Sequence, residues 1–481
     1  MNKEPSFIGR QSDLEKLARL LRKPSASLVV VQGRRRIGKS RLIEEFAKKY
    51  TFYQFSALPP TAHTTAQSQR DEFARQLSLQ THLPEVTSDD WSKLFLLLNE
   101  KIARGRVVVL FDEISWMGSK DSDFLGKVKN AWDLYFKKNP QLIFVLCGSA
   151  SAWIEKNILS NTGFFGRPSL KLVVEELPLT DCAKFWGKQG EKISAYEKFK
   201  LLSVTGGVPR YLEEIRPHVP AEENIKSLCF SKGGVLMDEF EHIFSDLFSN
   251  RSATYKKIVR TLVNGPKELK EICKELKIGQ TGFISEYLDD LIKSGFVSRD
   301  HTWHIRSEES SKLSTFRLSD NYLRFYLKYI EKNRSKIDAN EFTLRALSGL
   351  PGWEAIMGFQ FENLVLNNRQ WIKQKLGIKP DEITFNNPFF QRKTTQTRGC
   401  QIDYLIQTRF GALYACEIKF LKSEIQPAII REVQQKLERL SYPKGFSIRP
   451  VLIHVNGVHP DVLDSGYFSE IVDFGEILSS R

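Results

Sequence analysis

The sequence has few of the features that zinc-binding, disulfide-linked and membrane proteins need. Its six cysteines are spread over 481 residues without a C-x-x-C pair, which argues against a zinc site or a disulfide framework. Its apolar runs at residues 28–31, 107–111 and 142–147 are far shorter than the roughly 20 residues of a membrane-spanning helix. The first residues contain no apolar stretch typical of a signal peptide. We therefore expect a cytoplasmic protein with no membrane partner.

Acidic residues are also scarce relative to basic ones. The chain has 71 Lys and Arg against 57 Asp and Glu, a formal net charge of +14 at pH 7. Because phosphate neutralisation supplies most non-specific affinity for nucleic acid, this charge favours a nucleic-acid partner, although solubility alone is the alternative. A chain of 481 residues is too long for one hydrophobic core and predicts three or four folded units.

A glycine-containing loop, GRRRIGKS at residues 33–40, lies between the apolar run at 28–31 and a stretch with helical spacing. In such a loop the glycines let backbone N–H groups surround phosphate oxygens, Lys39 reaches the β- and γ-phosphates, and the Ser40 hydroxyl can ligate Mg²⁺. The alternative is a glycine-rich turn that binds nothing. The loop predicts that a nucleoside triphosphate is bound by Gly33, Arg36, Ile37, Gly38, Lys39, Ser40 and Arg41.

A second apolar run, at residues 107–111, ends in two carboxylates, Asp112 and Glu113. This is a Walker-B pattern. Asp112 would hold Mg²⁺ together with Ser40, whereas Glu113 would orient and polarise the attacking water. Strand ends of this kind are common in α/β proteins, so the prediction depends on the phosphate loop that precedes them.

A third run, at residues 142–147, is followed by Ser149, which is a candidate sensor of the γ-phosphate. The alternative role of Ser149 is the N-cap of a helix beginning at residues 150–153. Arg167 and Arg210 each lie on a turn containing Gly and Pro, and phosphoryl transfer commonly needs such a cation near the γ-phosphate. Either arginine could instead bind a carboxylate on the surface.

Several motifs together resemble those of the prokaryotic AAA+/STAND ATPases, especially the family first noted as expanded in archaea. They are FIGR at residues 7–10, DLEKL at 13–17, the GRRRIGKS loop, LFDE at 110–113, CGS at 147–149 and GGVPRYL at 206–212. The resemblance covers the first half of the chain. It implies ATP as the nucleotide, Ile8, Gly9 and Arg10 near the adenine, and Arg210 as the second sensor of a lid domain. It also raises the possibility of a homo-oligomer or protein partner in which Arg167 acts in trans.

The middle of the chain has a different pattern. Helical spacing at residues 177–245 fits a lid, and three short helices followed by small strands at 246–320 outline a winged helix-turn-helix. Its expected recognition helix, residues 281–294, carries Glu286, Asp289 and Asp290 against one lysine, Lys293. The helix is therefore negatively charged, which is unfavourable in a DNA groove lined by phosphates. We favour packing or contact with the phosphate backbone over base reading. Within a helical connector at 321–350, the aromatic residues of 322–330 favour a core stripe over a base-stacking platform.

Near the C-terminus the sequence reads as a hairpin, QIDYLIQ at residues 401–407 and ALYACEIKF at 412–420. Strand alternation puts Glu417 and Lys419 on one face. Asp403 and Glu417 could ligate Mg²⁺ and activate water against a phosphodiester, with Lys419 stabilising the developing charge. The helical segment at 358–366 adds Glu362 as a third carboxylate.

In that order, Glu362, Asp403, Glu417 and Lys419 resemble the PD-(D/E)XK nuclease superfamily, and residues 351–481 look like the domain that often follows this type of ATPase. The predicted fold class is α/β: a P-loop parallel sheet at 1–176, a helical lid, a winged helix and a C-terminal restriction-endonuclease-like domain. We expect an ATPase that uses Mg²⁺ and is coupled to cleavage of DNA in preference to RNA. The alternative is an ATP-operated switch whose nuclease-like domain binds nucleic acid or a protein without cleaving.

Overall fold

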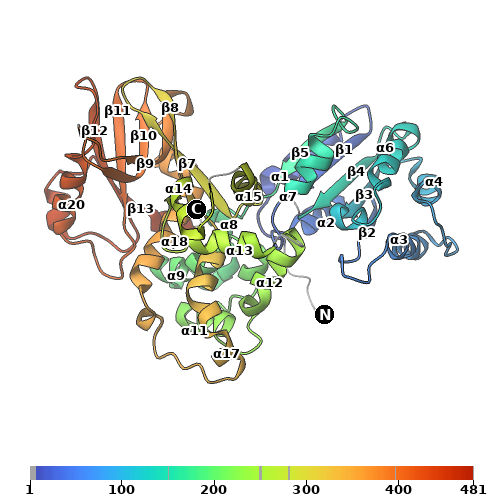
Figure 1. Ribbon diagram of the computed structural model, residues 1–481, viewed down its shortest axis with the longest axis horizontal. Coiled ribbons are helices and arrows are strands. Elements are labelled where there is room, and N and C mark those ends of the chain that lie inside the picture. The colour runs from blue at the N-terminus through green and yellow to red at the C-terminus, as the bar shows by residue number, and fades with distance from the viewer. Residues whose placement is uncertain (1–6, 150, 249–251, 280–281, 396, 480–481) are drawn as a thin grey trace. The chain divides into compact units, whose positions relative to one another are not determined.

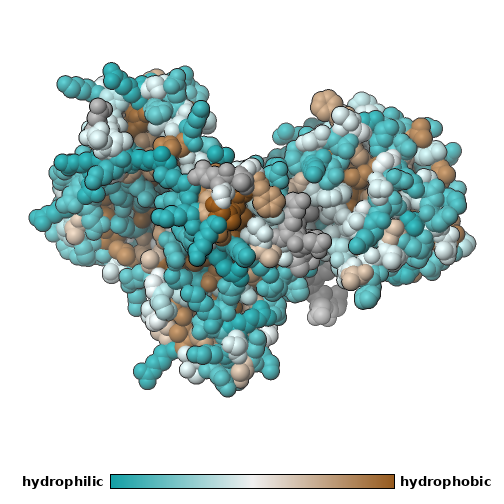
Figure 2. All heavy atoms as spheres, in the orientation of Figure 1, coloured by the Kyte–Doolittle hydropathy of each residue, from teal (hydrophilic) through white to brown (hydrophobic). Residues whose placement is uncertain are grey.

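The computed structural model of the protein describes residues 7–149, 151–248, 252–279, 282–395 and 397–479. The chain forms two compact units (Figure 1). The first comprises Met1–Glu176, Glu241–Ser252 and Lys293–Gly295, and the second comprises Leu177–Phe240, Ala253–Ile292 and Phe296–Arg481. In the described ranges no helix is long and apolar enough to cross a membrane, and the face drawn in Figure 2 is mainly hydrophilic.

The first unit is built on a five-stranded parallel sheet in the order β2-β3-β4-β1-β5 (Figure 1). The strands are β1 (Ser27–Gln32), β2 (Thr51–Ser56), β3 (Val107–Asp112), β4 (Ile143–Gly148) and β5 (Pro168–Val173). The three apolar runs of the sequence therefore form adjacent strands, with β4 between β1 and β3. Since parallel strands end at the same edge, the loops after β1, β3 and β4 emerge next to one another.

Helices cover both faces of this sheet, which explains why its central strands are apolar throughout. Val29 and Val31 pack on one side with the helices α1 (Gln11–Leu20) and α2 (Lys39–Ala47). Leu28 and Val30 point to the other side, where the core is completed by α3 (Ala66–Thr81), α4 (Trp91–Ile102) and α6 (Phe124–Leu134). The rigid sheet thus fixes the loops at its carboxyl edge.

The second unit begins with short helices and continues with a small three-stranded sheet. The helices are α8 (Leu179–Cys182), α9 (Ala195–Thr205), α10 (Pro209–Leu212), α11 (Ala221–Cys229) and the start of α12 (Val235–Phe248). There follow α13 (Ser252–Thr261), β6 (Lys267–Glu268), α14 (Leu269–Leu276), α15 (Gly282–Lys293), β7 (Val297–His304) and β8 (Glu309–Leu318), with sheet order β6-β8-β7. Thr281, the expected first residue of the recognition helix, lies outside the described residues.

The aromatic segment is part of the core, as the helical spacing predicted. In α16 (Asn321–Phe325) and the π-helical turn Tyr326–Ile330, the side chains of Tyr322, Phe325, Tyr326 and Tyr329 are buried. Arg324 is fully buried among them and donates hydrogen bonds to backbone carbonyls, including that of Leu318 at 2.6 Å. None of these rings is available as a base-stacking platform.

The C-terminal part of the second unit is a mixed five-stranded sheet in the order β13-β12-β11-β10-β9. Its strands are β9 (Ile383–Gln391), β10 (Cys400–Thr408), β11 (Ala412–Ile418), β12 (Ser447–His454) and β13 (Glu470–Asp473). Strands β9 to β11 are antiparallel and β11 to β13 are parallel. The helices α18 (Trp353–Asn367), α19 (Arg369–Lys375) and α20 (Ala428–Leu437) accompany it. The expected hairpin of residues 401–420 is formed by β10 and β11.

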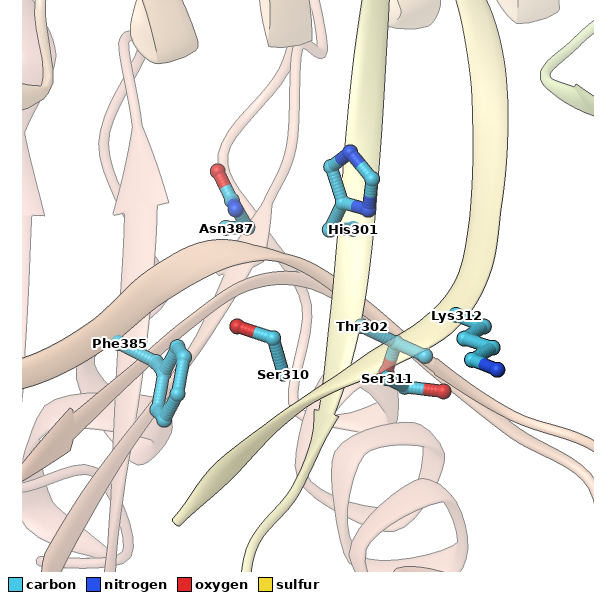
Figure 3. Close-up of a pocket in the computed structure, with 7 residues that line it drawn as sticks. All are labelled: His301, Thr302, Ser310, Ser311, Lys312, Phe385 and Asn387. Atoms are coloured by element: carbon cyan, nitrogen blue, oxygen red, sulfur yellow. The ribbon is translucent and has the colours of Figure 1, made fainter.

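The hairpin of β7 and β8 packs against this sheet. Trp303 of β7 stacks on Phe385 of β9, and its indole N–H donates a hydrogen bond to Gln407 at 2.6 Å. Thr302 donates to the carbonyl of Phe390 at 2.9 Å. Figure 3 shows the pocket that remains between the hairpin and β9, lined by His301, Thr302, Ser310, Ser311, Lys312, Phe385 and Asn387. These contacts give the hairpin a packing role.

Candidate functional sites

The loop between β1 and α2 is curved by residues with positive φ. Gly33, Arg36 and Gly38 have φ values of 155°, 67° and 86°. At Gly33 a Cβ atom would lie 2.3 Å from the carbonyl oxygen of Val174, so a larger residue would displace the backbone directly after β5. Gly38 is the N-cap of α2, whose first turn contains no acidic residue. The positive end of α2 is therefore left to stabilise an anion.

Two basic residues hold the loop in shape. Lys39 is 6% exposed, and its ammonium donates a hydrogen bond to the carbonyl of Arg34 at 3.1 Å, across the loop. Arg10, in the left-handed conformation that precedes α1, donates to the carbonyl of Ile37 at 3.0 Å. The hydrogen bond from Arg10 brings the predicted adenine-side segment with Ile8 and Gly9 against the phosphate loop.

The two predicted magnesium ligands of the first unit are in contact. Ser40, in the first turn of α2, donates a 2.6 Å hydrogen bond to Asp112 at the end of β3. Hydroxyl and carboxylate oxygens suit Mg²⁺, which keeps several waters and takes few protein ligands. The pair therefore fits a Mg²⁺ ion that accompanies a nucleotide at Lys39.

The carboxylate of Glu113 contacts Ser149. Glu113 adopts a left-handed conformation with φ of 52°. Its carboxylate accepts two hydrogen bonds from Ser149, one from the backbone N–H at 3.0 Å and one from the hydroxyl at 2.9 Å. The predicted water-polarising residue and the predicted sensor thus form one unit at the ends of adjacent strands. Ala150, which an N-cap role of Ser149 would involve, lies outside the described residues.

The two candidate arginines both bind carboxylates of their own unit. Arg167 donates to Asp133, the shortest bond being 2.8 Å, and this contact lowers the pKa of Asp133 to about 2. Arg210 belongs to α10 in the second unit and pairs with Glu213 at 3.4 Å and Glu214 at 2.7 Å. Binding of a carboxylate was the alternative that the sequence left open for both residues. Their part in ATP hydrolysis stays a prediction.

A separate cluster of charged residues lies on the C-terminal sheet. The register that pairs Tyr404 of β10 with Cys416 of β11 brings Asp403 beside the end of β11, where it accepts a hydrogen bond from the N–H of Ile418 at 2.9 Å. Glu417 is buried at this strand end. Lys419, directly after β11, lies 3.2 Å from Glu417. Three of the predicted nuclease residues, Asp403, Glu417 and Lys419, therefore form one cluster.

A further cation of this cluster was missed in the sequence. Lys436 of α20 donates a hydrogen bond to Glu417 and lies 3.5 Å from Asp403. Another residue of α20, Glu432, pairs with Lys419 at 3.2 Å. The signal was present in the helical spacing, because Lys436 follows the buried Ile429 by seven residues and so falls on the inward face of an amphipathic helix.

The pKa values of two carboxyls reflect this environment. Burial raises the pKa of Glu362 on α18 to about 7; Asp403 adds to the effect, and Arg317 and Arg324 oppose it. Burial and then the neighbouring Glu417 raise the pKa of Asp403 to about 6. Neighbouring carboxyl groups with raised pKa values are common at functional sites, and buried ion-pair networks produce them as well.

The oxygen ligands of this cluster suit a divalent ion that keeps most of its bound water. They are too few to enclose a metal completely. In the described part of the chain no group of three or more His, Cys, Asp or Glu side chains is placed to hold a metal. Asp403 and Glu417 are two oxygen ligands, which is the number that a Mg²⁺ ion retaining its waters accepts. The residues therefore fit Mg²⁺ at this position only as a two-carboxylate site.

Comparison with known proteins identifies the N-terminal part. Residues 7–215 match the model of a family described as an ATPase domain predominantly from Archaea. An uncharacterized protein of Methanocaldococcus jannaschii is 23% identical over 359 residues, covering 74% of this chain and 76% of that protein. This region is thus an ATPase domain of archaeal type, consistent with its P-loop, its Walker-B strand and its parallel sheet.

Two solved structures are also similar. The Walker-type ATPase of Pyrococcus abyssi is 18% identical, with a TM-score of 0.49, and the match covers 67% of this chain and 96% of that one. The ORC2 protein of Aeropyrum pernix, in ADPNP–ADP complexes, is 14% identical with a TM-score of 0.42 over 70% of this chain and 96% of that one.

Proposed function

We propose that ATP binding and hydrolysis in the first unit control a C-terminal domain that binds DNA and cleaves it with Mg²⁺. The observation that carries the proposal is the cluster at the end of β11, where Asp403 accepts a hydrogen bond from Ile418 at 2.9 Å and Glu417 lies 3.2 Å from Lys419. The charge of Asp403 also helps to raise the pKa of Glu362. A structural ion pair needs one carboxylate and one cation. Two carboxylates beside a lysine are what metal-assisted phosphodiester hydrolysis requires.

Each residue of the ATP site has a part in this account. Lys39 would bind the β- and γ-phosphates, while Ser40 and Asp112 would hold Mg²⁺, which neutralises charge on the phosphates. Glu113 would orient the attacking water after leaving its hydrogen bonds with Ser149. Mutual contact of Glu113 and Ser149 supports a link between γ-phosphate sensing and hydrolysis.

In the C-terminal domain, Mg²⁺ held by Asp403 and Glu417 would polarise a phosphate oxygen and lower the pKa of a bound water. Lys419 would stabilise the negative charge that develops on the phosphodiester. Glu362 has a pKa near neutrality, so it can carry a proton at the pH of the reaction. The net charge of +14 supports a polyanionic substrate.

We infer five parts of the chain: an ATPase core at 1–176, a lid at 177–245, a winged helix at 246–320, a connector at 321–350 and a nuclease-like domain at 351–481. The order of α13, β6, α14, α15, β7 and β8 supports the winged helix. Its hairpin packs on β9, which supports a packing role over base reading. A homo-oligomer would allow Arg167 to act in trans after release from Asp133.

A second candidate function is an ATP-operated switch in which the C-terminal domain binds nucleic acid or a protein without cleaving. One observation favours it: Lys436 contacts both Asp403 and Glu417, so the two carboxylates are neutralised by the chain itself. A switch of this kind predicts slow hydrolysis of ATP and different small-angle scattering curves with ATP and ADP, a difference that Lys39→Ala would remove.

The nuclease proposal is tested with plasmid and linear DNA in Mg²⁺ or Mn²⁺. We expect cleavage by the wild type, and loss of cleavage without loss of ATP turnover in Asp403→Asn and Lys419→Ala. Arg431→Ala, which removes a charge from an exposed position of α20, should cleave as the wild type does. Absence of cleavage of any DNA topology by the wild type would contradict the proposal and favour the switch.

A further inference from the structure

Lys436 is held on the inward face of α20 by the packing of that helix. Ile429 and Val433 lie in a buried cluster with Leu452 of β12. These apolar contacts fix the last turn of α20 over the cluster. The fold therefore places the backbone of Lys436 beside the two carboxylates, within reach of its ammonium.

The contacts of the cluster account for all four carboxylate oxygens of Asp403 and Glu417. One oxygen of Asp403 accepts the N–H of Ile418 at 2.9 Å, and the other lies 3.5 Å from Lys436. One oxygen of Glu417 faces Lys419 at 3.2 Å, and the other accepts from Lys436. The ammonium of Lys436 is the only group among these that contacts both carboxylates, which is the arrangement expected of a bridging metal ion.

We propose that Lys436 is a built-in competitor of the divalent cation: its ammonium occupies the position between Asp403 and Glu417, and metal binding requires it to move out. This inference rests on the proposed function, because it assumes that these two carboxylates are the metal ligands. A lysine ammonium and a divalent ion cannot both approach the same carboxylate pair without strong repulsion. The side chain of Lys436 is 28% exposed, so it has solvent into which it can turn.

The ammonium of Lys436 compensates the negative charge of the two carboxylates. Two adjacent carboxylates that are 20% and 7% exposed would repel each other strongly if both were ionised and uncompensated. Lys436 supplies the compensating charge. The wild type should consequently bind divalent ions weakly at this site, and removal of the ammonium should strengthen binding.

The test is isothermal titration of Mn²⁺ alone into the full-length protein without nucleotide, at fixed pH and ionic strength. The variants are Lys436→Met, Lys436→Arg and Arg431→Met; the last removes one positive charge from an exposed position of the same helix. A variant with Asp403→Asn and Glu417→Gln identifies the signal that belongs to this cluster. Circular dichroism checks that α20 and the sheet remain folded in each variant.

We expect Lys436→Met to bind Mn²⁺ at least about tenfold more tightly than the wild type, with Lys436→Arg and Arg431→Met unchanged. If the wild type and Lys436→Met bind Mn²⁺ with equal affinity, Lys436 does not compete with the metal. The metal site of the proposed function would remain intact in that case. If Mn²⁺ binds none of the proteins at this cluster, both the competition and the metal site are wrong. If Lys436→Met unfolds, Lys436→Gln replaces it in the same titration: tighter binding of Mn²⁺ than in the wild type supports the inference, and equal affinity overturns it.

Discussion

Replacement of Glu362 by glutamine should make the stability of the protein less dependent on pH. Burial is the main reason why the pKa of Glu362 rises from 4.5 to about 7, and the charge of Asp403 adds to the rise. A carboxyl whose pKa is raised in the folded state holds its proton more tightly there than in the unfolded chain. Its favourable contribution is complete below pH 4.5 and is lost as the pH rises through about 7.

The size of the effect follows from the pKa values. A tenfold change in proton affinity is worth about 1.4 kcal/mol, so the raised pKa of Glu362 costs about 3 kcal/mol of folding free energy at pH 8 and about 1 kcal/mol at pH 5.5. Glutamine has a similar shape and no charge. Relative to the wild type, Glu362→Gln should therefore gain about 2 kcal/mol between pH 5.5 and pH 8.

Scanning calorimetry of the wild type and Glu362→Gln at both pH values measures this gain. Comparison at each pH cancels the other titrating groups, because they are common to both proteins. Glu354→Gln provides a matched control, since Glu354 is an exposed carboxyl on the same helix, α18. A difference between wild type and Glu362→Gln that is the same at pH 5.5 and pH 8 would refute the electrostatic account of this cluster.

Three further results are expected in the ATPase domain. Lys39→Ala should weaken ATP binding at least about tenfold in isothermal titration, because a charge-assisted contact is lost, whereas Lys48→Ala at the exposed end of α2 should not. Glu113→Gln should retain ATP binding but lower turnover about 100-fold in a phosphate-release assay; normal turnover would exclude Glu113 as the residue that polarises water. Asp133→Asn, which removes the partly exposed ion pair with Arg167, should lower the stability at pH 7 by about 1 kcal/mol in thermal melts, and no change would show that the pair is not stabilising.

The sequence predicted those features that depend on local spacing. The phosphate loop, Asp112 and Glu113 lie within or directly after apolar strands, so strand and loop patterns were sufficient to find them. The hairpin of β10 and β11 was also predicted, because alternation and a turn containing Gly411 fix its register. Buried aromatic residues at Tyr322 and its neighbours followed from helical periodicity.

Contacts between distant segments could not be predicted in the same way. Lys436 reaches Asp403 across 33 residues, and Arg167 reaches Asp133 across 34. Such pairs depend on how helices pack on sheets, which periodicity does not specify. For the same reason the sequence did not indicate that Trp303 would stack on Phe385, and so attach the small sheet to the C-terminal one.

The central claim is that ATP controls cleavage by the carboxylate cluster. It is tested most directly by the rate of nicking of supercoiled DNA in Mn²⁺, with and without ATP, for the wild type and Glu417→Ala. We predict that the wild type nicks at least about tenfold faster with ATP and that Glu417→Ala does not nick in either condition. Equal nicking by the two proteins, or a wild-type rate that ATP leaves unchanged, would contradict the account.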